Sequence, residues 1–215
     1  MLRSALILGL LGLVGPFAID MYLPAMPAIA ASYGASETAV QATITAYFIA
    51  FGLGQLFYGP WADQAGRKLP IMVGLVLFLI ASFGAAFAPT MTALIGWRAL
   101  QGLGGAVLMV VPRAIIRDQY TGTQATRLMA MLMLVISISP MLAPLAGSAV
   151  MALADWRAIF MTLAVLAIAA LALTAFAQPE TLPVKRRVRI NPRNLARGAK
   201  VLLSDPIFMG LTFIG

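Results

Sequence analysis

Few side chains in this sequence could do chemistry, and two of them lie inside apolar segments. Asp20 closes an apolar run that starts after Ser4, and Arg98 lies seven residues beyond Met91 in another such run. An ionisable group in the hydrocarbon of a bilayer is costly, so it usually has a partner or serves a transport pathway. Histidine is absent. Asp20 is therefore the candidate for taking up and releasing a proton within a membrane.

The depths of these two charges suggest that they act together. Asp20 lies roughly 24 Å of helix rise beyond Ser4, and Arg98 lies roughly 10 Å in from the opposite side. Both charges are thus expected in the same half of the membrane, where Arg98 would tune the protonation of Asp20. Two plainer interpretations stay open: Asp20 could cap a frayed helix end, and Arg98 could extend outward to the headgroups.

A second set of side chains suits the wall of a binding cavity. Cavities for drug-sized ligands are mostly apolar with a few polar groups. The residues of this kind are Tyr22, Tyr47, Phe51 and Gln101. Packing in the protein interior or against lipid is an equal alternative for each of them. The chain has no cysteine, and no nucleophile–base pair or metal-ligand cluster is visible, so we expect no cofactor, no metal and no enzyme activity.

The composition requires that these residues be positioned by membrane helices. Of the 215 residues 61% are hydrophobic and 10% are charged, and a water-soluble fold of this size cannot hide so much apolar surface. A span needs about 20 apolar residues. We predict an all-α membrane protein with six spans, at about residues 4–23, 39–58, 69–87, 91–111, 127–152 and 157–177. A secretory signal peptide is the alternative for the first run.

The positive charges orient the spans. Thirteen of the fifteen lysines and arginines fall at one end of the predicted bundle: Arg3, Arg67, Lys68, Arg113, Arg117, Arg127, Lys185, Arg186, Arg187, Arg189, Arg193, Arg197 and Lys200. Cytoplasmic loops of membrane proteins carry such an excess, so the N-terminus is expected inside the cell. The net charge of +8 is thereby explained without a nucleic-acid partner, and the lipid bilayer is the expected surrounding.

Two segments with glycine and proline are expected to shape the bundle. In the first, which runs from Gly59 to Lys68, two glycines and a proline predict a tight reversal between two spans. In the fifth span, Pro144 cannot donate a backbone hydrogen bond and Gly147 permits close approach, so this helix is predicted to be bent and tightly packed.

Several motifs resemble one family. Gly59, Asp63, Gly66, Arg67 and Lys68 fit the loop signature G-x-x-x-D-x-x-G-R-K/R of the major facilitator superfamily. The run from Arg98 to Gly104 is similar to the fourth-span signature of its proton-coupled members, and Pro144 and Gly147 remain from the fifth-span antiporter motif. Other segments, among them 20–27 and 179–182, resemble the bicyclomycin/chloramphenicol resistance (Bcr/CflA) branch of drug:proton antiporters.

This resemblance implies the N-terminal half of a twelve-span transporter, built of two three-helix inverted repeats. It implies a bacterial inner-membrane antiporter that exchanges protons for small hydrophobic or amphipathic compounds, with a C-terminal six-span half as partner. Residues 59–68 would then form a cytoplasmic gate. We divide the chain into a six-span domain (1–184), a basic cytoplasmic linker (185–205) and the start of a seventh span (206–215). An exporter of a metabolite such as a sugar or purine, or a truncated membrane protein that transports nothing, are the alternatives.

Overall fold

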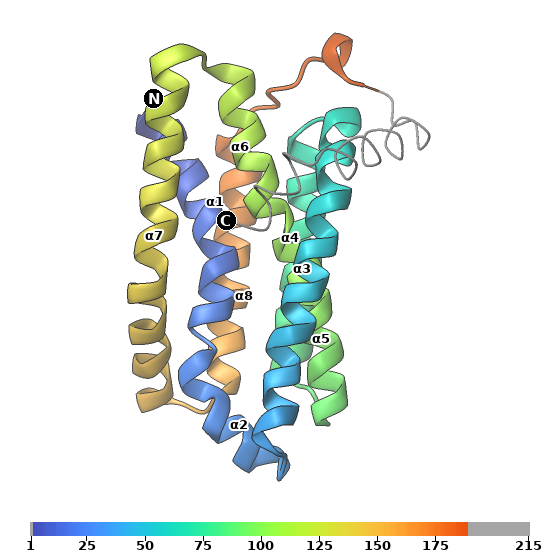
Figure 1. Ribbon diagram of the computed structural model, residues 1–215, viewed down its shortest axis with the longest axis vertical. Helices are drawn as coiled ribbons and strands as arrows, with labels where there is room; N and C mark the ends of the chain where they lie inside the picture. The colour runs from blue at the N-terminus through green and yellow to red at the C-terminus, as the bar shows by residue number, and fades with distance from the viewer. Residues whose placement is uncertain (1, 189–215) are drawn as a thin grey trace, which may run out of the picture.

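The computed structural model of the protein describes residues 2–188. Most of the predicted linker and all of the predicted seventh span, at residues 206–215, lie outside the described residues. Every element within the described part is helical (Figure 1). The helices are α1 (Leu2–Asp20), α2 (Met26–Tyr33), α3 (Glu37–Ala65), α4 (Lys68–Ala86), α5 (Met91–Gly105), α6 (Val107–Gln119), α7 (Gly122–Leu153) and α8 (Arg157–Ala172), with short turns at Leu23–Ala25, Leu173–Ala177 and Val184–Arg186.

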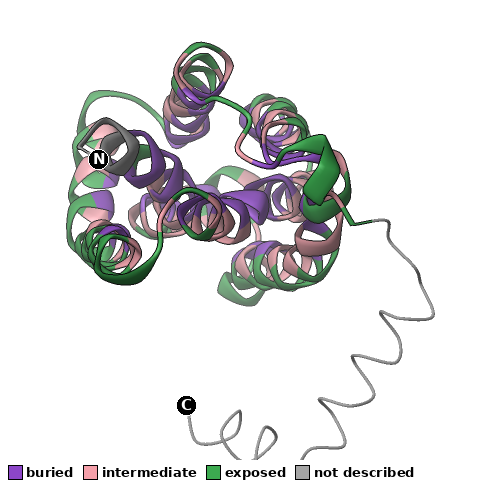
Figure 2. Ribbon diagram, turned by 90° about the horizontal axis from the view of Figure 1, so that it is seen from above, coloured by how far each residue is buried: buried purple, intermediate pink, exposed green. Residues whose placement is uncertain are grey.

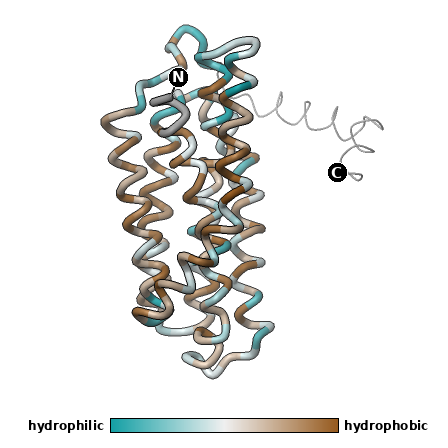
Figure 3. The backbone as a smooth tube through the Cα atoms, turned by 90° about the vertical axis from the view of Figure 1, so that its left-hand side faces the viewer, coloured by the Kyte–Doolittle hydropathy of each residue, from teal (hydrophilic) through white to brown (hydrophobic). Residues whose placement is uncertain are grey.

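The described helices form six segments that are long and apolar enough to cross a membrane. They are Ile7–Tyr33, Glu37–Ala65, Lys68–Ala86, Met91–Gln119, Gly122–Leu153 and Arg157–Ala177. Apolar residues dominate the middle of the bundle and polar residues gather at its two ends (Figure 3). The prediction of a six-span, all-α membrane protein is confirmed.

The six segments pack as an antiparallel bundle around buried inner faces (Figures 1 and 2). The main contacts join α3 and α4 to α5, α4 to α8, and α1 to α7. Glycines permit the closest crossing: a Cβ on Gly102 of α5 would collide with the carbonyl of Tyr47 on α3, and one on Gly104 would collide with the backbone of Phe78 on α4. Small residues at helix contacts are typical of membrane bundles.

The first span is longer than predicted. The chain bends after Asp20, passes through the turn Leu23–Ala25 and continues as α2 to Tyr33, where Gly34 in a left-handed conformation (φ 56°) ends the helix. Pro24 and Pro27 lack the backbone N–H that a straight helix would need, which accounts for the bend. The predicted end of the first span at about residue 23 is therefore wrong.

The predicted reversal is also displaced. Helix α3 continues through Gly59, Pro60 and Asp63, and only Gly66 and Arg67 separate it from α4, which begins at Lys68. The turn requires a positive φ, and Gly66 supplies it (φ 95°), whereas Gly59 lies in regular helix. The segment predicted as one polar loop is therefore a helix end, a two-residue turn and a helix start.

The segment between the predicted fourth and fifth spans, residues 112–126, is mostly helix. Helix α6 runs to Gln119, and α7 begins three residues later at Gly122. Its charged residues Arg113 and Arg117 alternate with buried apolar positions such as Ile115. A helix with one apolar face keeps its form beyond the hydrocarbon because its polar face meets water or headgroups.

Candidate functional site

Arg98 of α5 lies at the centre of a buried polar and aromatic cluster. Its side chain is fully buried. Its Nη1 donates hydrogen bonds to the carbonyl of Ala18 (3.1 Å) and to Oε1 of Gln101 (2.5 Å). Its Cζ lies 4.5 Å from the ring centroids of both Tyr22 and Tyr47. A desolvated guanidinium over an aromatic face is stabilised by about 2 kcal/mol, so two rings replace part of its lost hydration.

A hydrogen-bond chain fixes the orientation of Gln101. The Ser82 hydroxyl on α4 donates to the carbonyl of Phe78 (2.8 Å), and Gln101 Nε2 lies 2.7 Å from the same hydroxyl oxygen. Since a serine hydroxyl has one hydrogen, Ser82 can only accept from Gln101. The amide nitrogen of Gln101 must therefore face Ser82, which turns its oxygen toward Arg98.

The two tyrosines are anchored from their hydroxyl ends. The Thr43 hydroxyl donates to the carbonyl of Val40 (2.6 Å), so its contact of 2.7 Å with Tyr22 makes Tyr22 the donor. The Tyr47 hydroxyl donates to the carbonyl of Gly15 (3.2 Å). Both rings are thus held by α1 and α3 with their faces toward the guanidinium.

Arg98 and Asp20 lie at the same depth but do not pair in this conformation. The contact of Arg98 with Ala18 places it beside the backbone two residues before Asp20. Within residues 2–188, Asp20 is half-buried and forms no hydrogen bond or ion pair, and no carboxylate lies within ion-pair distance of Arg98. Nε and Nη2 of Arg98 are buried without a hydrogen-bond partner in this part of the chain. The guanidinium therefore has donors free for another group.

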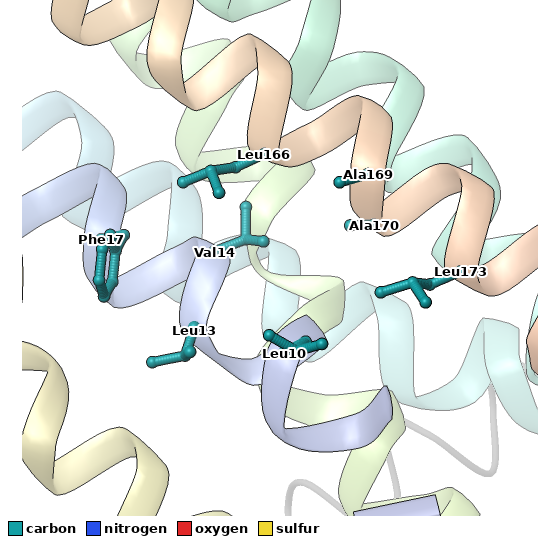
Figure 4. A pocket seen from close by; sticks show the side chains of 8 residues that line it. All are labelled: Leu10, Leu13, Val14, Phe17, Leu166, Ala169, Ala170 and Leu173. Atoms are coloured by element: carbon teal, nitrogen blue, oxygen red, sulfur yellow. The ribbon is translucent and has the colours of Figure 1, made fainter. Parts of the chain in front are cut away.

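Of the other residues predicted for a cavity, Tyr22, Tyr47 and Gln101 pack directly against Arg98. Tyr22, Tyr47 and Gln101 are fully buried, while Phe51 is half-buried and stacks on Tyr47 with a centroid distance of 5.7 Å. None of the four lines the apolar pocket between α1 and α8, which has a volume of about 190 Å³ (Figure 4). That pocket is formed by Leu10, Leu13, Val14, Phe17, Leu166, Ala169, Ala170 and Leu173.

At the end of the bundle that carries the α3–α4 turn, Arg67 joins three spans. Its Nη1 donates to Asp63 of α3 (2.6 Å) and its Nε to Asp118 of α6 (2.7 Å), and its own side chain is largely buried. Partial burial would lower the pKa of Arg67, but the hydrogen bonds that it donates to Asp118 and Asp63 outweigh burial and raise this pKa. The guanidinium is thus a charged clamp between α3, α4 and α6.

Glu180 and Lys68 form a reciprocal contact between α4 and the end of the sixth span. The carboxylate of Glu180 accepts backbone N–H groups of Arg67 (2.9 Å) and Lys68 (3.2 Å) at the start of α4, and those of Thr181 and Leu182 (both 2.9 Å). Partial burial would raise the pKa of Glu180, but these four backbone bonds together lower it. In return, Lys68 Nζ donates to the carbonyl of Ala175 (2.7 Å).

In α7 the structure places Pro140 and Pro144 within one continuous helix. Gly147 is buried, and a Cβ there would collide with the carbonyl of Met21 at the bend of the first span. The predicted close packing at Gly147 is confirmed, and a bend at Pro144 stays a prediction.

Sequence reasoning missed Ser82, Thr43 and Glu180 as site residues. Ser82 and Thr43 are isolated hydroxyls in apolar helices, and such residues usually bond to their own helix. Their rarity could have marked them as site residues, because a polar side chain within a span tends to face another polar group. Glu180 was noted only as part of the segment 179–182, and its contact with the α4 start depends on the fold.

Comparison with known proteins identifies the family. The sequence profile of the Major Facilitator Superfamily matches residues 8–215. The chain belongs to the Major Facilitator Superfamily. It is 37% identical over 214 residues to the uncharacterized MFS-type transporter YdgK of Bacillus subtilis, covering 97% of this chain and 52% of that protein. It is 38% identical over 179 residues to multidrug resistance protein D of Escherichia coli, covering 83% of this chain and 45% of that protein.

Another relative is also named for drug resistance. It is the bicyclomycin resistance protein homolog of Haemophilus influenzae, 31% identical over 208 residues, or 97% of this chain and 52% of that protein. The chain thus spans about half the length of the curated relatives it matches. These names bear out the resemblance to drug-resistance facilitators.

Solved structures of facilitators share the fold. The proton:xylose symporter XylE superposes with a TM-score of 0.74 at 16% identity, covering 84% of this chain and 45% of that one. A peptide transporter superposes with a TM-score of 0.72 at 17% identity, covering 99% of this chain and 46% of that one. At this identity the likeness supports the facilitator fold and nothing about substrate.

Proposed function

We propose that this chain is the N-terminal half of a proton-coupled exporter of small hydrophobic or amphipathic compounds. The proposal rests on Arg98, a fully buried cation inside a facilitator bundle, two of whose donors have no hydrogen-bond partner among residues 2–188. A charge in that position is expensive and is retained where it meets another charged or polar group during the transport cycle. The names of the drug-resistance relatives supply the substrate class.

In the proposed cycle Asp20 binds the proton and Arg98 stabilises the deprotonated form. The backbone contact of Arg98 with Ala18 keeps the guanidinium near Asp20, and Nε and Nη2 are the donors that a carboxylate would accept. A conformational change that brings the two side chains together would release the proton, and their separation would favour its uptake.

Substrate would bind beside this cluster, first against Phe51; Tyr22, Tyr47 and Gln101 are fully buried here and would be reached only after a conformational change. Phe51 is half-buried and stacks on Tyr47, so it is the member of the set nearest to solvent or to the second half. Aromatic and amide side chains in an apolar setting suit amphipathic ligands. A ligand that contacts these rings would then change the surroundings of the Arg98 guanidinium.

The Arg67 clamp, with Asp63 and Asp118 as its acceptors, would gate the cytoplasmic entrance against the C-terminal half, together with the neighbouring Gly59, Gly66 and Lys68. The close contact of Gly147 with the first span, next to Pro144, would keep α7 sealed to α1 and limit leakage of ions. Both roles require the second six-span half as partner.

The bundle would lie in the bacterial inner membrane with its N-terminus in the cytoplasm. Most basic residues of the described part lie in or beside the α3–α4 turn, the α6–α7 turn and residues 185–187, at the end of the bundle where α1 begins (Figure 1); Arg98 and Arg157 are the exceptions. A reporter fused after Lys185 is expected inside the cell, and one inserted at Ser36 outside. Both reporters on the same side of the membrane would refute the orientation and the six-span count together.

A test of the function uses a twelve-span protein, obtained by co-expressing this chain with a matching C-terminal half. Cells that express both parts are expected to accumulate less ethidium, and an uncoupler of the proton gradient should restore accumulation. Asp20→Asn should abolish the difference while Asp155→Asn, which alters an exposed acid at the opposite side of the bundle from the clamp, should keep it. Normal ethidium accumulation with a well-inserted wild type would favour a metabolite exporter or a protein that transports nothing.

A further inference from the structure

The chain does not leave the bundle where the sixth span ends. The segment after α8 runs across the end of the bundle that carries the α3–α4 turn (Figure 1). There the N–H of Val188 donates to the carbonyl of Asp63 on α3 (3.0 Å). We call residues 180–188 the strap, because they connect the end of the sixth span to the end of α3.

The strap closes both helix ends at the α3–α4 turn. Asp63 lies in the last turn of α3, and the last four carbonyls of a helix have no partner within it. Val188 supplies a donor for one of these carbonyls. At its other end, the strap places Glu180 against the N–H groups of Arg67 and Lys68, at the start of α4. Each helix end therefore depends on a different end of the strap.

The strap also lies directly against the Arg67 clamp. The Thr181 hydroxyl donates to Oδ2 of Asp118, an acceptor of the clamp, at 3.4 Å. A Cβ on Gly66 would come within 2.8 Å of Nη2 of Arg187, so the strap packs closely on the turn itself.

The two ends of the strap are held with different strength. The Glu180 carboxylate accepts four backbone N–H groups. The other end is held by the single bond of Val188 and by a 4.0 Å ion pair between Arg187 and Glu180, and a pair that reaches solvent contributes little.

Two further features weaken the Val188 end. Nε of Arg187 is buried without a partner in the described part of the chain, which costs free energy. The side chains of Val184 and Val188 have exposed fractions of 75% and 66%, so little apolar packing holds this part. A segment with few buried contacts opens locally, and the Val188 end can detach while Glu180 stays bound.

We propose that the strap holds α3 at the clamp while the gate is closed, and that its Val188 end detaches when the gate opens. This inference rests on the gating role proposed above for the clamp. In the proposed twelve-span protein the chain continues from Val188 toward the second half. A movement of that half therefore pulls on the end that a single backbone bond holds.

A first test asks whether the strap reaches α3, and it needs no transport. The chain has no cysteine, and Val188 bonds to the peptide group that joins Asp63 to Gln64. In the full chain, Gln64→Cys/Val188→Cys should be joined by a short thiol crosslinker about tenfold faster than Gln64→Cys/Thr123→Cys, because proximity raises the effective concentration. Thr123 is exposed on α7 at the same end of the bundle. Equal rates would overturn the strap.

A second test asks whether detachment opens the gate of the assembled twelve-span protein. Val188→Pro removes the N–H that bonds to Asp63. Val184→Pro is the matched control, because the N–H of Val184 donates no hydrogen bond within residues 2–188. Ala114→Cys, between α3 and α6 beside the clamp, reports opening through its rate of labelling by a membrane-impermeant maleimide. Val188→Pro should raise this rate about fivefold, the effect of one net hydrogen bond on an opening equilibrium.

The outcomes separate this inference from the proposed function. A fivefold rise in Val188→Pro with no change in Val184→Pro would support the strap as part of the gate. Equal labelling rates in the two variants would overturn that role, since opening would then not depend on the bond to Asp63. A wild type that exports no ethidium would refute the proposed function, whereas the strap is still decided by the crosslinking and labelling rates.

Discussion

Replacing Glu180 by alanine is expected to loosen the contact between α4 and the end of the sixth span. The carboxylate accepts the N–H groups of Arg67 and Lys68 at the start of α4 and also those of Thr181 and Leu182. The first two bonds are lost without a replacement acceptor from the protein, although water can reach this partly exposed site. At about 1 kcal/mol for each net hydrogen bond, we expect a loss of about 1 to 3 kcal/mol in the free energy of unfolding.

The measurement is SDS-induced unfolding of the purified chain in mixed micelles, followed by tryptophan fluorescence. Glu180→Gln keeps one amide oxygen and should lie between the wild type and Glu180→Ala. Asp155→Asn is the control, because it alters an exposed ion pair of 3.4 Å with Arg157, and such pairs contribute little. A Glu180→Ala protein as stable as the Asp155→Asn protein would refute the idea that Glu180 caps α4.

The same contact predicts a pH dependence. Folding lowers the pKa of Glu180 below its ordinary value of 4.5, so its stabilising effect is complete above that value and is lost as the pH falls through the lower pKa of the folded state. The difference in stability between the wild type and Glu180→Gln should therefore be constant near neutral pH and shrink in acid below pH 4.5. A difference that grew on acidification would contradict the assigned contact.

Two further predictions concern helix packing in the outer part of the bundle and the Arg98 cluster. Gly147→Ala should destabilise the chain by about 2 kcal/mol or more, because the new methyl group would collide with the Met21 carbonyl. The control Gly96→Ala should be neutral or stabilising, because no atom lies near the position of its Cβ. Equal effects of the two variants in the unfolding assay would exclude the close contact at Gly147. Ser82→Ala should lower the free energy of unfolding by about 1 to 3 kcal/mol, because the buried amide of Gln101 loses its acceptor. An unchanged unfolding curve would refute the hydrogen bond between Gln101 and Ser82.

The class of fold could be predicted because every helix that crosses the bilayer needs an apolar segment long enough to span the hydrocarbon. The ends of the helices could not be predicted as well. The extension of α6 past Pro112 and of α3 past Pro60 shows why: hydropathy marks where a helix leaves the hydrocarbon, and a helix with polar residues on one face continues beyond that point. The position of the turn depended on Gly66, whose backbone conformation the sequence does not reveal.

The sequence predicts similar heights for Asp20 and Arg98 along the bundle but does not reveal which side chains pack around Arg98. The similar depth of Asp20 and Arg98 follows from counting residues along two helices, and the contact of Arg98 with Ala18 agrees with it. Which groups surround the guanidinium depends on how five spans pack, so Ser82 could not be found by spacing along one helix. Tyr22 and Tyr47 were expected at a cavity wall. The close crossing of α3 and α5 at Gly102 brings Tyr47 to Arg98, and the packing of the first span against α3, through the Tyr22–Thr43 hydrogen bond, places Tyr22.

The central claim, proton-coupled export, is tested most directly by drug-induced proton release in inside-out membrane vesicles. The vesicles contain the assembled twelve-span protein, and a pH gradient, acidic inside, is imposed and followed with a pH-sensitive dye. Adding ethidium should dissipate the gradient in wild-type vesicles as protons leave in exchange for the drug, and Asp20→Asn vesicles should keep it. A gradient that ethidium leaves unchanged in wild-type vesicles, or one that Asp20→Asn dissipates equally well, would contradict the assignment of proton exchange to this half.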